Sequence, residues 1–165
     1  MSIGLGVDIV EIERISGVLA RSNAFVSKVY TEAEQLYCNK RANPALHYAA
    51  CFAAKEAAAK ALGTGFFTRG VRPSEIEVTH DAKGKPQILL HSKTAALAKE
   101  QGVIDMPLSL SHTHAMAVAN VAAITKDSIK EKEQRSNSAS ELAKRFKDAR
   151  ALIDEISSET AAALE

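Results

Sequence analysis

The stretch FAAKEAAAKALGTG, residues 52–65, constrains the fold of this chain more than any other. Alanine, lysine, glutamate and leucine are strong helix formers, and no β-branched residue interrupts the run before Thr64. Gly63 marks the expected helix end, because glycine tolerates the left-handed conformation that terminates helices. The sequence therefore predicts a long helix from about residue 45 to residue 62, followed by a glycine-rich loop over residues 63–70.

Glu56 and Lys60 are four residues apart in this helix, so they share one face. One interpretation is an ordinary solvent-exposed ion pair. The other follows from the alanines, whose small side chains let a helix pack closely on both sides and partly enclose the two charges. An enclosed carboxylate needs a cation and an enclosed lysine needs an anion, and a metal bound to a phosphate would meet both needs.

Residues 3–12 alternate apolar side chains in the way typical of a strand, with Asp8 in the middle. Aspartate suits a strand interior poorly and is rarely buried without a partner. Asp8 is therefore either an exposed edge position or a ligand held on a rigid element. Gly4 and Gly6 resemble the start of a dinucleotide-binding fingerprint, but they are expected to precede the strand and no third glycine follows, which excludes that motif.

A helix is predicted over residues 13–21, where Arg14 and Arg21 are two turns apart on one face and Phe25 follows. These three residues are either a solvated basic edge or a small positive patch beside an apolar anchor. The second arrangement would suit an acidic partner helix.

The middle of the chain alternates helices and strands. Thr31 and Glu34 form a capping-box pattern that opens a helix running through Cys38, and residues 81–86 have the composition of a hairpin loop. The remaining predicted elements are strands over residues 76–80, 87–90, 108–113 and 115–124, and a helix over residues 92–101 that Gly102 ends.

His112 and His114 would lie on one face of the strand over residues 108–113 and its continuation, at a spacing that can hold a metal. No third ligand is near in the sequence, so a polar strand end is the favoured interpretation of the two histidines. From Lys126 the composition shifts. A linker-like patch over residues 136–140 precedes an amphipathic helix whose apolar seam is Leu142, Phe146, Ala149, Ile153 and Ile156.

The chain carries 21 basic and 20 acidic residues, so its charge predicts no nucleic-acid partner and no membrane surface. No apolar run is long enough to span a bilayer, and the first residues lack the pattern of a signal peptide. Cys38 and Cys51 are the two cysteines and have no metal-binding spacing, which is typical of reduced thiols in a cytoplasmic protein.

Three stretches together resemble the holo-acyl-carrier-protein synthases, the small 4'-phosphopantetheinyl transferases. They are GVDIVEIERI (residues 6–15), FAAKEA with KALGTG (residues 52–65), and LSLSHT (residues 108–113). Thr31 and Glu34 also match the family pattern. The order and spacing agree throughout, and the resemblance covers residues 1–125, leaving residues 126–165 as a C-terminal extension without a family counterpart.

The resemblance implies transfer of the 4'-phosphopantetheine arm of coenzyme A to a serine of an apo acyl carrier protein, a step of fatty acid biosynthesis, with release of adenosine 3',5'-bisphosphate. It implies Mg²⁺ held by Asp8 and Glu56, with Lys60 on the coenzyme A phosphates. It also implies coenzyme A contacts from Gly63, Gly65 and His112, the last at the 3'-phosphate. Glu56, acting through a water, is the expected general base.

The resemblance further implies that Arg14, Arg21 and Phe25 bind the acidic carrier protein, and that the chain forms a homotrimer with active sites between subunits. The fold that the resemblance implies is α+β, an antiparallel sheet packed on the long helix. Two rival functions stay open: a non-catalytic coenzyme A-binding module, and an assembly protein that oligomerises through the tail. The first would not require carboxylates for a metal, whereas the second is compatible with catalysis.

Overall fold

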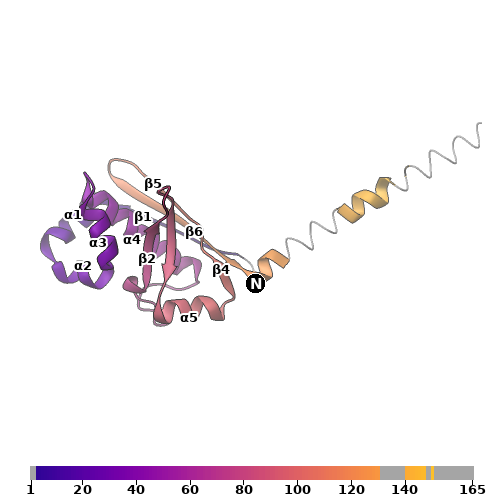
Figure 1. Cartoon of the computed structure of the whole chain (residues 1–165), viewed down its shortest axis with the longest axis horizontal. Helices are drawn as coiled ribbons and strands as arrows, with labels where there is room; N and C mark the ends of the chain where they lie inside the picture. Colours follow the sequence, from indigo (N-terminus) through magenta and orange to yellow (C-terminus); the bar gives the residue numbers. More distant parts are fainter. Residues whose placement is uncertain (1–2, 131–139, 148–149, 151–165) are drawn as a thin grey trace, which may run out of the picture. The chain divides into compact units, whose positions relative to one another are not determined.

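The computed structural model describes residues 3–130, 140–147 and 150, and the chain divides into two units, Met1–Lys126 and Asp127–Glu165. The first unit contains every element named below (Figure 1). In the second unit, the described residues 127–130 and 140–147 are helical, and Leu142 and Phe146 are exposed. The rest of the predicted linker and seam, including Ala149, Ile153 and Ile156, lies outside the described residues.

The first unit is built around helix α4, Pro44–Ala61. Its first turn is stabilised by the side chain of Asn43, which accepts a hydrogen bond of 3.2 Å from the backbone amide of Leu46. The helix gives way after Leu62 to Gly63, whose φ of 69° is the left-handed conformation expected at this position. The long helix predicted from the sequence is therefore confirmed.

An antiparallel sheet packs on α4. Strand β6, Met116–Thr125, pairs with β1, Gly4–Glu11, on one side, and with β4, Val103–Asp105, and β5, Leu108–His112, on the other. Within the described residues β1 has only β6 as a neighbour, so β1 is an edge strand. This sheet on a long helix confirms the predicted α+β fold.

Strand β1 approaches α4 closely enough that only glycine fits at two positions. A β-carbon on Gly6 would lie 1.9 Å from the carbonyl oxygen of Ala57, and one on Gly4 would lie 2.1 Å from that of Ala61. Gly4 and Gly6 therefore lie inside β1, which agrees with the strand predicted over residues 3–12, and the expectation that the two glycines precede the strand is wrong. Their role is close packing of the strand backbone on the helix backbone.

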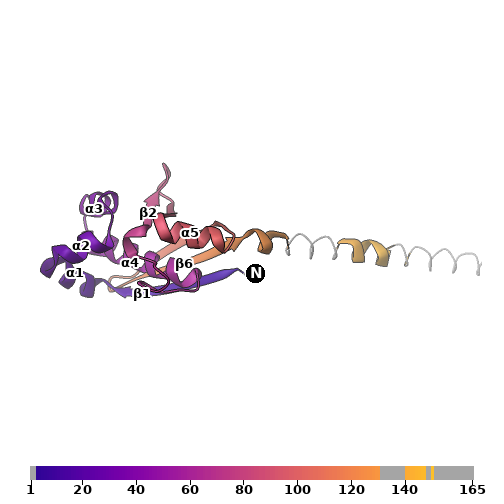
Figure 2. The same cartoon turned by 90° about the horizontal axis from the view of Figure 1, so that it is seen from below.

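A second, two-stranded sheet and a group of helices complete the first unit. Strands β2, Ile76–His80, and β3, Pro86–Leu90, form a hairpin, and α4 lies between this hairpin and β1 (Figure 2). The remaining helices are α1 (Ile12–Arg21), α2 (Asn23–Val29), α3 (Glu32–Asn39), the short 3₁₀ helix η1 (Pro73–Glu75) and α5 (Ser92–Glu100). Thr31 and Glu34 form the predicted capping box at the start of α3.

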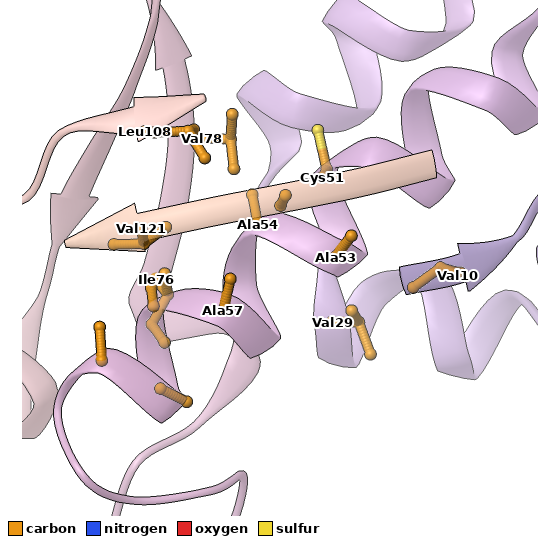
Figure 3. Packing of buried hydrophobic residues seen from close by; sticks show 14 of the residues in the cluster. Val10, Val29, Cys51, Ala53, Ala54, Ala57, Ile76, Val78, Leu108 and Val121 are labelled. Atoms are coloured by element: carbon orange, nitrogen blue, oxygen red, sulfur yellow. The ribbon is translucent and has the colours of Figure 1, made fainter. Parts of the chain in front are cut away.

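The core is unusual in that alanines of α4 supply much of it. Ala53, Ala54 and Ala57 belong to one buried cluster with Val121 of β6 and Ile76 of β2 (Figure 3). Because alanine side chains are small, the strand and helix backbones lie close together, and the buried face of the helix is nearly smooth. The free cysteines Cys38 and Cys51 are buried in the same core.

Helix α2, strand β4 and the 3₁₀ helix η1 were not predicted from the sequence, and one predicted strand ends one residue earlier than expected. The short helix α2 begins after Ser22, whose side chain accepts a hydrogen bond from the amide of Phe25, and β4 has only three residues. The predicted strand over residues 108–113 ends at His112, and Thr113 to Ala115 form the turn into β6. None of the helices in the described part of the chain is long and apolar enough to cross a membrane.

Candidate active site

Asp8 lies on the edge strand β1, on the face that packs against α4. The side chains of β1 alternate, so that Gly6, Asp8 and Val10 face the helix while Val7 and Ile9 are exposed on the other face. Only 17% of the Asp8 side chain is accessible. The two interpretations of Asp8 are thus both partly right, because it is at a sheet edge and is also held towards the helix.

Helix α4 presents Lys60 to this aspartate. The Nζ atom of Lys60 donates a hydrogen bond of 2.7 Å to Oδ1 of Asp8 and one of 3.1 Å to the carbonyl oxygen of Val7. None of the ion pairs among the described residues joins Lys60 to Glu56, so the interpretation as a simple pair along the helix is wrong. The side chain of Lys60 is also 47% exposed, so it is not enclosed.

Glu56 is half-buried one turn before Lys60. Partial burial raises the pKa of the Glu56 carboxyl group above its ordinary value, and the nearby negative charge of Asp8 raises it further, while Lys60 acts in the opposite direction. Burial is the larger cause of this shift, and the repulsion by Asp8 exceeds the opposing effect of Lys60. Such a pair of carboxylates is a favourable place for a bound cation.

Asp8 and Glu56 line one pocket of about 270 Å³. The same pocket is lined by Arg14 of α1, by Phe25 of α2 and by Phe52, one turn before Glu56 on α4. Phe25 is partly buried and packs against Phe52 in a tilted arrangement with ring centroids 6.1 Å apart, so it forms a wall of the pocket. The pocket therefore brings together residues that the sequence placed in two separate groups, one for a metal and one for a partner.

Arg21 does not line this pocket. Its side chain is exposed and its Nε donates a hydrogen bond of 2.9 Å to the carbonyl oxygen of Gly17, one turn earlier in α1. Arg14 and Arg21 lie on the exposed surface of the same helix, but only Arg14 reaches the pocket.

The glycine-rich loop that follows α4 contains two non-glycine residues with positive φ. These are Phe67, with φ of 62°, and Arg69, with φ of 53°, a conformation that costs free energy and that is found at functional loops. Gly63 and Arg69 line a separate pocket of about 270 Å³, and a β-carbon on Gly65 would meet nothing within 4 Å. The loop therefore presents open backbone beside the end of α4.

His112 lies in a third pocket, of about 360 Å³, with Tyr37, His47 and His80. Partial burial lowers the pKa of both His47 and His80, and the positive charge of Arg41 lowers them further. His114 is in the turn after β5, so the prediction that both histidines share one strand face is wrong. A single chain thus does not place His112 in the pocket of Asp8 and Glu56.

The sequence did not single out Lys55, a charged residue of α4 that is completely buried. Its Nζ lies 2.7 Å from Oε2 of Glu34, and both side chains are inaccessible to solvent. Burial lowers the pKa of Lys55, and the negative charge of Glu34 opposes this effect. The sequence contained no direct signal for this pair, although it did place Glu34 in a capping box and Lys55 among the alanines of α4.

The donor set at Asp8 and Glu56 fits a small hard cation. No group of three or more histidine, cysteine, aspartate or glutamate side chains able to hold a metal occurs within residues 3–130, 140–147 and 150. Two carboxylates are the usual protein share of a Mg²⁺ site, since this ion keeps several waters and takes further oxygens from substrate phosphates. The pocket that Asp8 and Glu56 share is the observation that favours a cation here, and the repulsion between the two groups accords with it.

The chain is similar to proteins of one family. The family model described as the 4'-phosphopantetheinyl transferase superfamily matches residues 4–119. The holo-[acyl-carrier-protein] synthase of Caldanaerobacter subterraneus subsp. tengcongensis is 42% identical over 121 residues, which are 72% of this chain and 94% of that protein.

Solved structures of the same family also resemble this chain. The holo-[acyl-carrier-protein] synthase of Neisseria meningitidis matches with a TM-score of 0.67 at 34% identity, over 74% of this chain and 98% of that one. The synthase of Bacillus anthracis, solved in complex with CoA (3',5'-ADP), matches with a TM-score of 0.61 at 34% identity, over 74% and 96%.

Proposed function

The chain belongs to the holo-acyl-carrier-protein synthases of the 4'-phosphopantetheinyl transferase superfamily, and from this premise we propose the reaction and the residues that perform it. It transfers 4'-phosphopantetheine from coenzyme A to a serine hydroxyl of an apo acyl carrier protein. The observation that carries the assignment to a particular site is the pocket in which Asp8 and Glu56 face each other beside Lys60.

In this reaction the serine oxygen attacks the phosphorus that bears the pantetheine arm. A new phosphorus–oxygen bond forms, the pyrophosphate bond of coenzyme A breaks, and adenosine 3',5'-bisphosphate leaves with the electron pair. The serine proton must be accepted by a base. Transfers of this kind depend mainly on positioning and on stabilising charge at the phosphoryl oxygens.

Asp8 and Glu56 would hold Mg²⁺ between β1 and α4. Bound there, the ion would supply neutralisation of the negative charge that develops on the pyrophosphate. Asp8 is suited to this role because β1 is packed directly on the backbone of α4, which limits how far the two carboxylates can separate. Glu56 is suited to it because it shares the pocket with Asp8, and the repulsion between the two groups accords with a cation there.

Glu56 is also the proposed general base, acting through a water molecule. A carboxyl group with a raised pKa is a better proton acceptor near neutral pH than an ordinary glutamate. Lys60 is proposed to exchange its hydrogen bond with Asp8 for the phosphates of coenzyme A, which its 47% exposed side chain can reach without rearrangement of the helix.

Coenzyme A is proposed to bind along the loop after α4, with Gly63 and Gly65 offering backbone close to the nucleotide. His112 is proposed to bind the 3'-phosphate. Because His112 lines a different pocket from Asp8 in one chain, a complete site needs His112 from a neighbouring copy. This requirement agrees with active sites located between subunits.

A homotrimer is supported by the outer face of the first sheet. Ile3 and the β1 residues Leu5, Val7 and Ile9 are 50%, 70%, 50% and 61% exposed, an apolar row that water should not favour. Leu5 and Ile9 pair with Ala122 and Val118 of β6, which extends the apolar surface across two strands. We assign this face to contacts between copies of the chain.

The acidic carrier protein is proposed to dock on α1. Arg14 lies at the mouth of the pocket and Arg21 two turns further along, so both can attract an acidic helix, while Phe25 shapes the entrance. Docking here would bring the serine of the carrier protein to the carboxylates. The two buried free cysteines accord with a reducing, cytoplasmic location for the reaction.

The test is incubation of the purified chain with apo acyl carrier protein, coenzyme A and Mg²⁺, followed by mass spectrometry. We expect the carrier protein to gain the mass of one phosphopantetheine group, and adenosine 3',5'-bisphosphate to appear in equal amount. Binding of coenzyme A without any mass gain, at all Mg²⁺ concentrations, would instead establish the chain as a non-catalytic binding module.

A further inference from the structure

We infer that the buried pair of Glu34 and Lys55 is a positioning device for the reaction: it sets the rotation of α4 about its axis and so aims the Glu56 carboxylate at Asp8. Neither residue touches the pocket, so neither is a catalytic residue. The inference rests on the proposed transferase function and concerns how one helix is held.

Every polar atom of this pair is used. Lys55 Nζ donates to Glu34 Oε2 at 2.7 Å, to the carbonyl oxygen of Pro73 at 3.0 Å, and to that of Ile76. An ammonium group has three hydrogens, so all three are taken. Lys55 is therefore attached by directional bonds to α3, to η1 and to the start of β2.

Glu34 is held as firmly on its side. Its Oε2 also accepts a hydrogen bond of 2.8 Å from the amide of Thr31, and its Oε1 accepts one of 2.8 Å from the amide of Val78. The carboxylate is thus fixed by the capping box of α3 and by strand β2. A lysine bonded to it cannot turn with its helix unless these contacts break.

Stability alone does not explain why a charged pair is buried here. Taking two ions out of water costs several kcal/mol each, and well-packed apolar residues of similar volume are often as stabilising or more so. What the pair adds is direction. The other buried residues of α4 are mainly alanines, namely Ala49, Ala53, Ala54, Ala57, Ala58, Ala59 and Ala61.

Contacts made by such small side chains are nearly the same after a small rotation of the helix, because hydrophobic burial is not directional. Lys55 and Glu56 are adjacent, so they point about 100° apart around the axis. A helix turned by about 20° would move a glutamate carboxylate by roughly 2 Å at the outer radius of the helix. Displacements of about 1 Å can cost on the order of 100-fold in rate.

The experiment compares the double variant Glu34→Gln/Lys55→Met with the control variant Tyr30→Phe in the transfer assay. The double variant removes both charges together, so no uncompensated ion stays buried. Tyr30 is buried beside Lys55 and donates its hydroxyl proton to the carbonyl oxygen of Tyr48 at 3.1 Å. Tyr30→Phe therefore weakens the same part of the core without altering the pair.

We expect the double variant to fold, to lose at least about tenfold in kcat, and to keep the KM values for coenzyme A and carrier protein within about threefold. Tyr30→Phe should lower the unfolding temperature by about 3 °C and leave kcat unchanged. A folded double variant with wild-type kcat overturns the inference. So does a rise in either KM at constant kcat, or a loss of kcat in Tyr30→Phe that matches its loss of stability.

If the double variant fails to fold, the single variant Glu34→Gln tests the positioning role instead. Its amide group has the shape of the carboxylate and keeps one acceptor oxygen. Measured well below its unfolding midpoint, it should show the same fall in kcat at constant KM, though smaller. Wild-type kcat in that variant also overturns the inference. A wild-type chain without transferase activity would refute the proposed function, whereas an active wild type with unaffected variants refutes only the positioning role.

Discussion

Lys60 Nζ lies 2.7 Å from Oδ1 of Asp8, and this bond joins helix α4 to strand β1 across 52 residues of the chain. The lysine therefore provides a positive charge at a carboxylate that is proposed to hold a metal. Its other acceptor, the carbonyl oxygen of Val7, belongs to the same strand. If Asp8 holds a metal as proposed, Lys60 and the cation would compete for its carboxylate until the phosphates of a substrate offered the lysine another partner.

The variant Lys60→Met tests this competition. Removing the ammonium group should make Mg²⁺ bind the coenzyme A-free protein more tightly, by roughly threefold or more, because one repelling charge is lost. The same change should lower kcat/KM for coenzyme A by at least about tenfold, since a phosphate contact disappears. Calorimetric titration and steady-state kinetics measure the two effects, with Lys99→Met on α5 as control. Weaker Mg²⁺ binding in Lys60→Met would contradict the competition.

The second prediction concerns Glu56 and pH. Because its pKa is raised in the folded chain, ionised Glu56 reduces stability, and this loss appears as the pH rises through the folded pKa and is absent below the ordinary value of about 4.5. Glu56→Gln should therefore raise the unfolding temperature at pH 7 to 8 without Mg²⁺, and leave it unchanged below pH 4. Thermal unfolding at several pH values measures this.

Mg²⁺ should reverse the order of the two proteins. The ion should stabilise the wild type against heat, since it binds the folded state alone, and should have little effect on Glu56→Gln. Activity of Glu56→Gln should fall on the order of 100-fold or more. Equal stabilisation of both proteins by Mg²⁺ would remove Glu56 from the metal site, and Asp8→Asn provides the parallel test.

The third prediction separates the two arginines of α1. Arg14→Ala should raise the KM for the carrier protein more than Arg21→Ala does, because only Arg14 lines the pocket. Both should spare the KM for coenzyme A, and both effects should shrink as the salt concentration rises. Lys99→Ala, on α5, is the control. A selective loss of coenzyme A binding in either arginine variant would contradict the prediction, because it would mean that α1 binds coenzyme A and not the carrier protein.

The fourth prediction concerns the apolar face of β1. Leu5→Glu should weaken the oligomer and lower activity, whereas Leu89→Glu, an equally apolar exposed leucine on β3, should do neither. Light scattering gives the oligomeric state. If His112 serves the site of another copy, mixing Asp8→Asn with His112→Ala should restore part of the activity that each variant lacks. No recovery in stably mixed oligomers would place both residues in one chain's site.

The fifth prediction concerns the tail. A chain ending at Thr125 should keep its kcat, because the family model ends at residue 119 and the proposed site residues all lie before that point. It should lose thermal stability or oligomer strength, since Leu142 and Phe146 are apolar side chains that need a cover. A well-folded but inactive trimer would show that the tail shapes the active site.

The sequence predicted the elements of the fold whose signals are local. Local backbone preferences determine three features, and the structure confirms all three. They are the alanine-rich helix, its end at Gly63, and the capping box of Thr31 and Glu34. Helix α2 was missed because it is short and depends on the Ser22 cap. The strand end at His112 was missed because the turn over Thr113 to Ala115 contains neither glycine nor proline to mark it.

Site geometry was less predictable, because it depends on which helix face meets which strand. Glu56 and Lys60 were correctly placed on one face, yet the partner of Lys60 is Asp8, which no spacing rule reveals. Lys55 was overlooked because a lysine in a helix is ordinarily exposed. Only the packing of α3 and β2 around α4 shows that this lysine is completely buried.

The glycines of β1 also limit which amino-acid substitutions this protein can accept during evolution. Because added atoms at Gly4 or Gly6 would collide with main-chain oxygens of α4, no rearrangement of neighbouring side chains can accommodate them. Every substitution there demands that a whole helix move, together with the charged residues that it carries. In a saturation screen these two positions should accept almost no replacement. The distance between strand β1 and helix α4 is thus fixed by contacts between their main chains, and changes in the surrounding side chains cannot alter it.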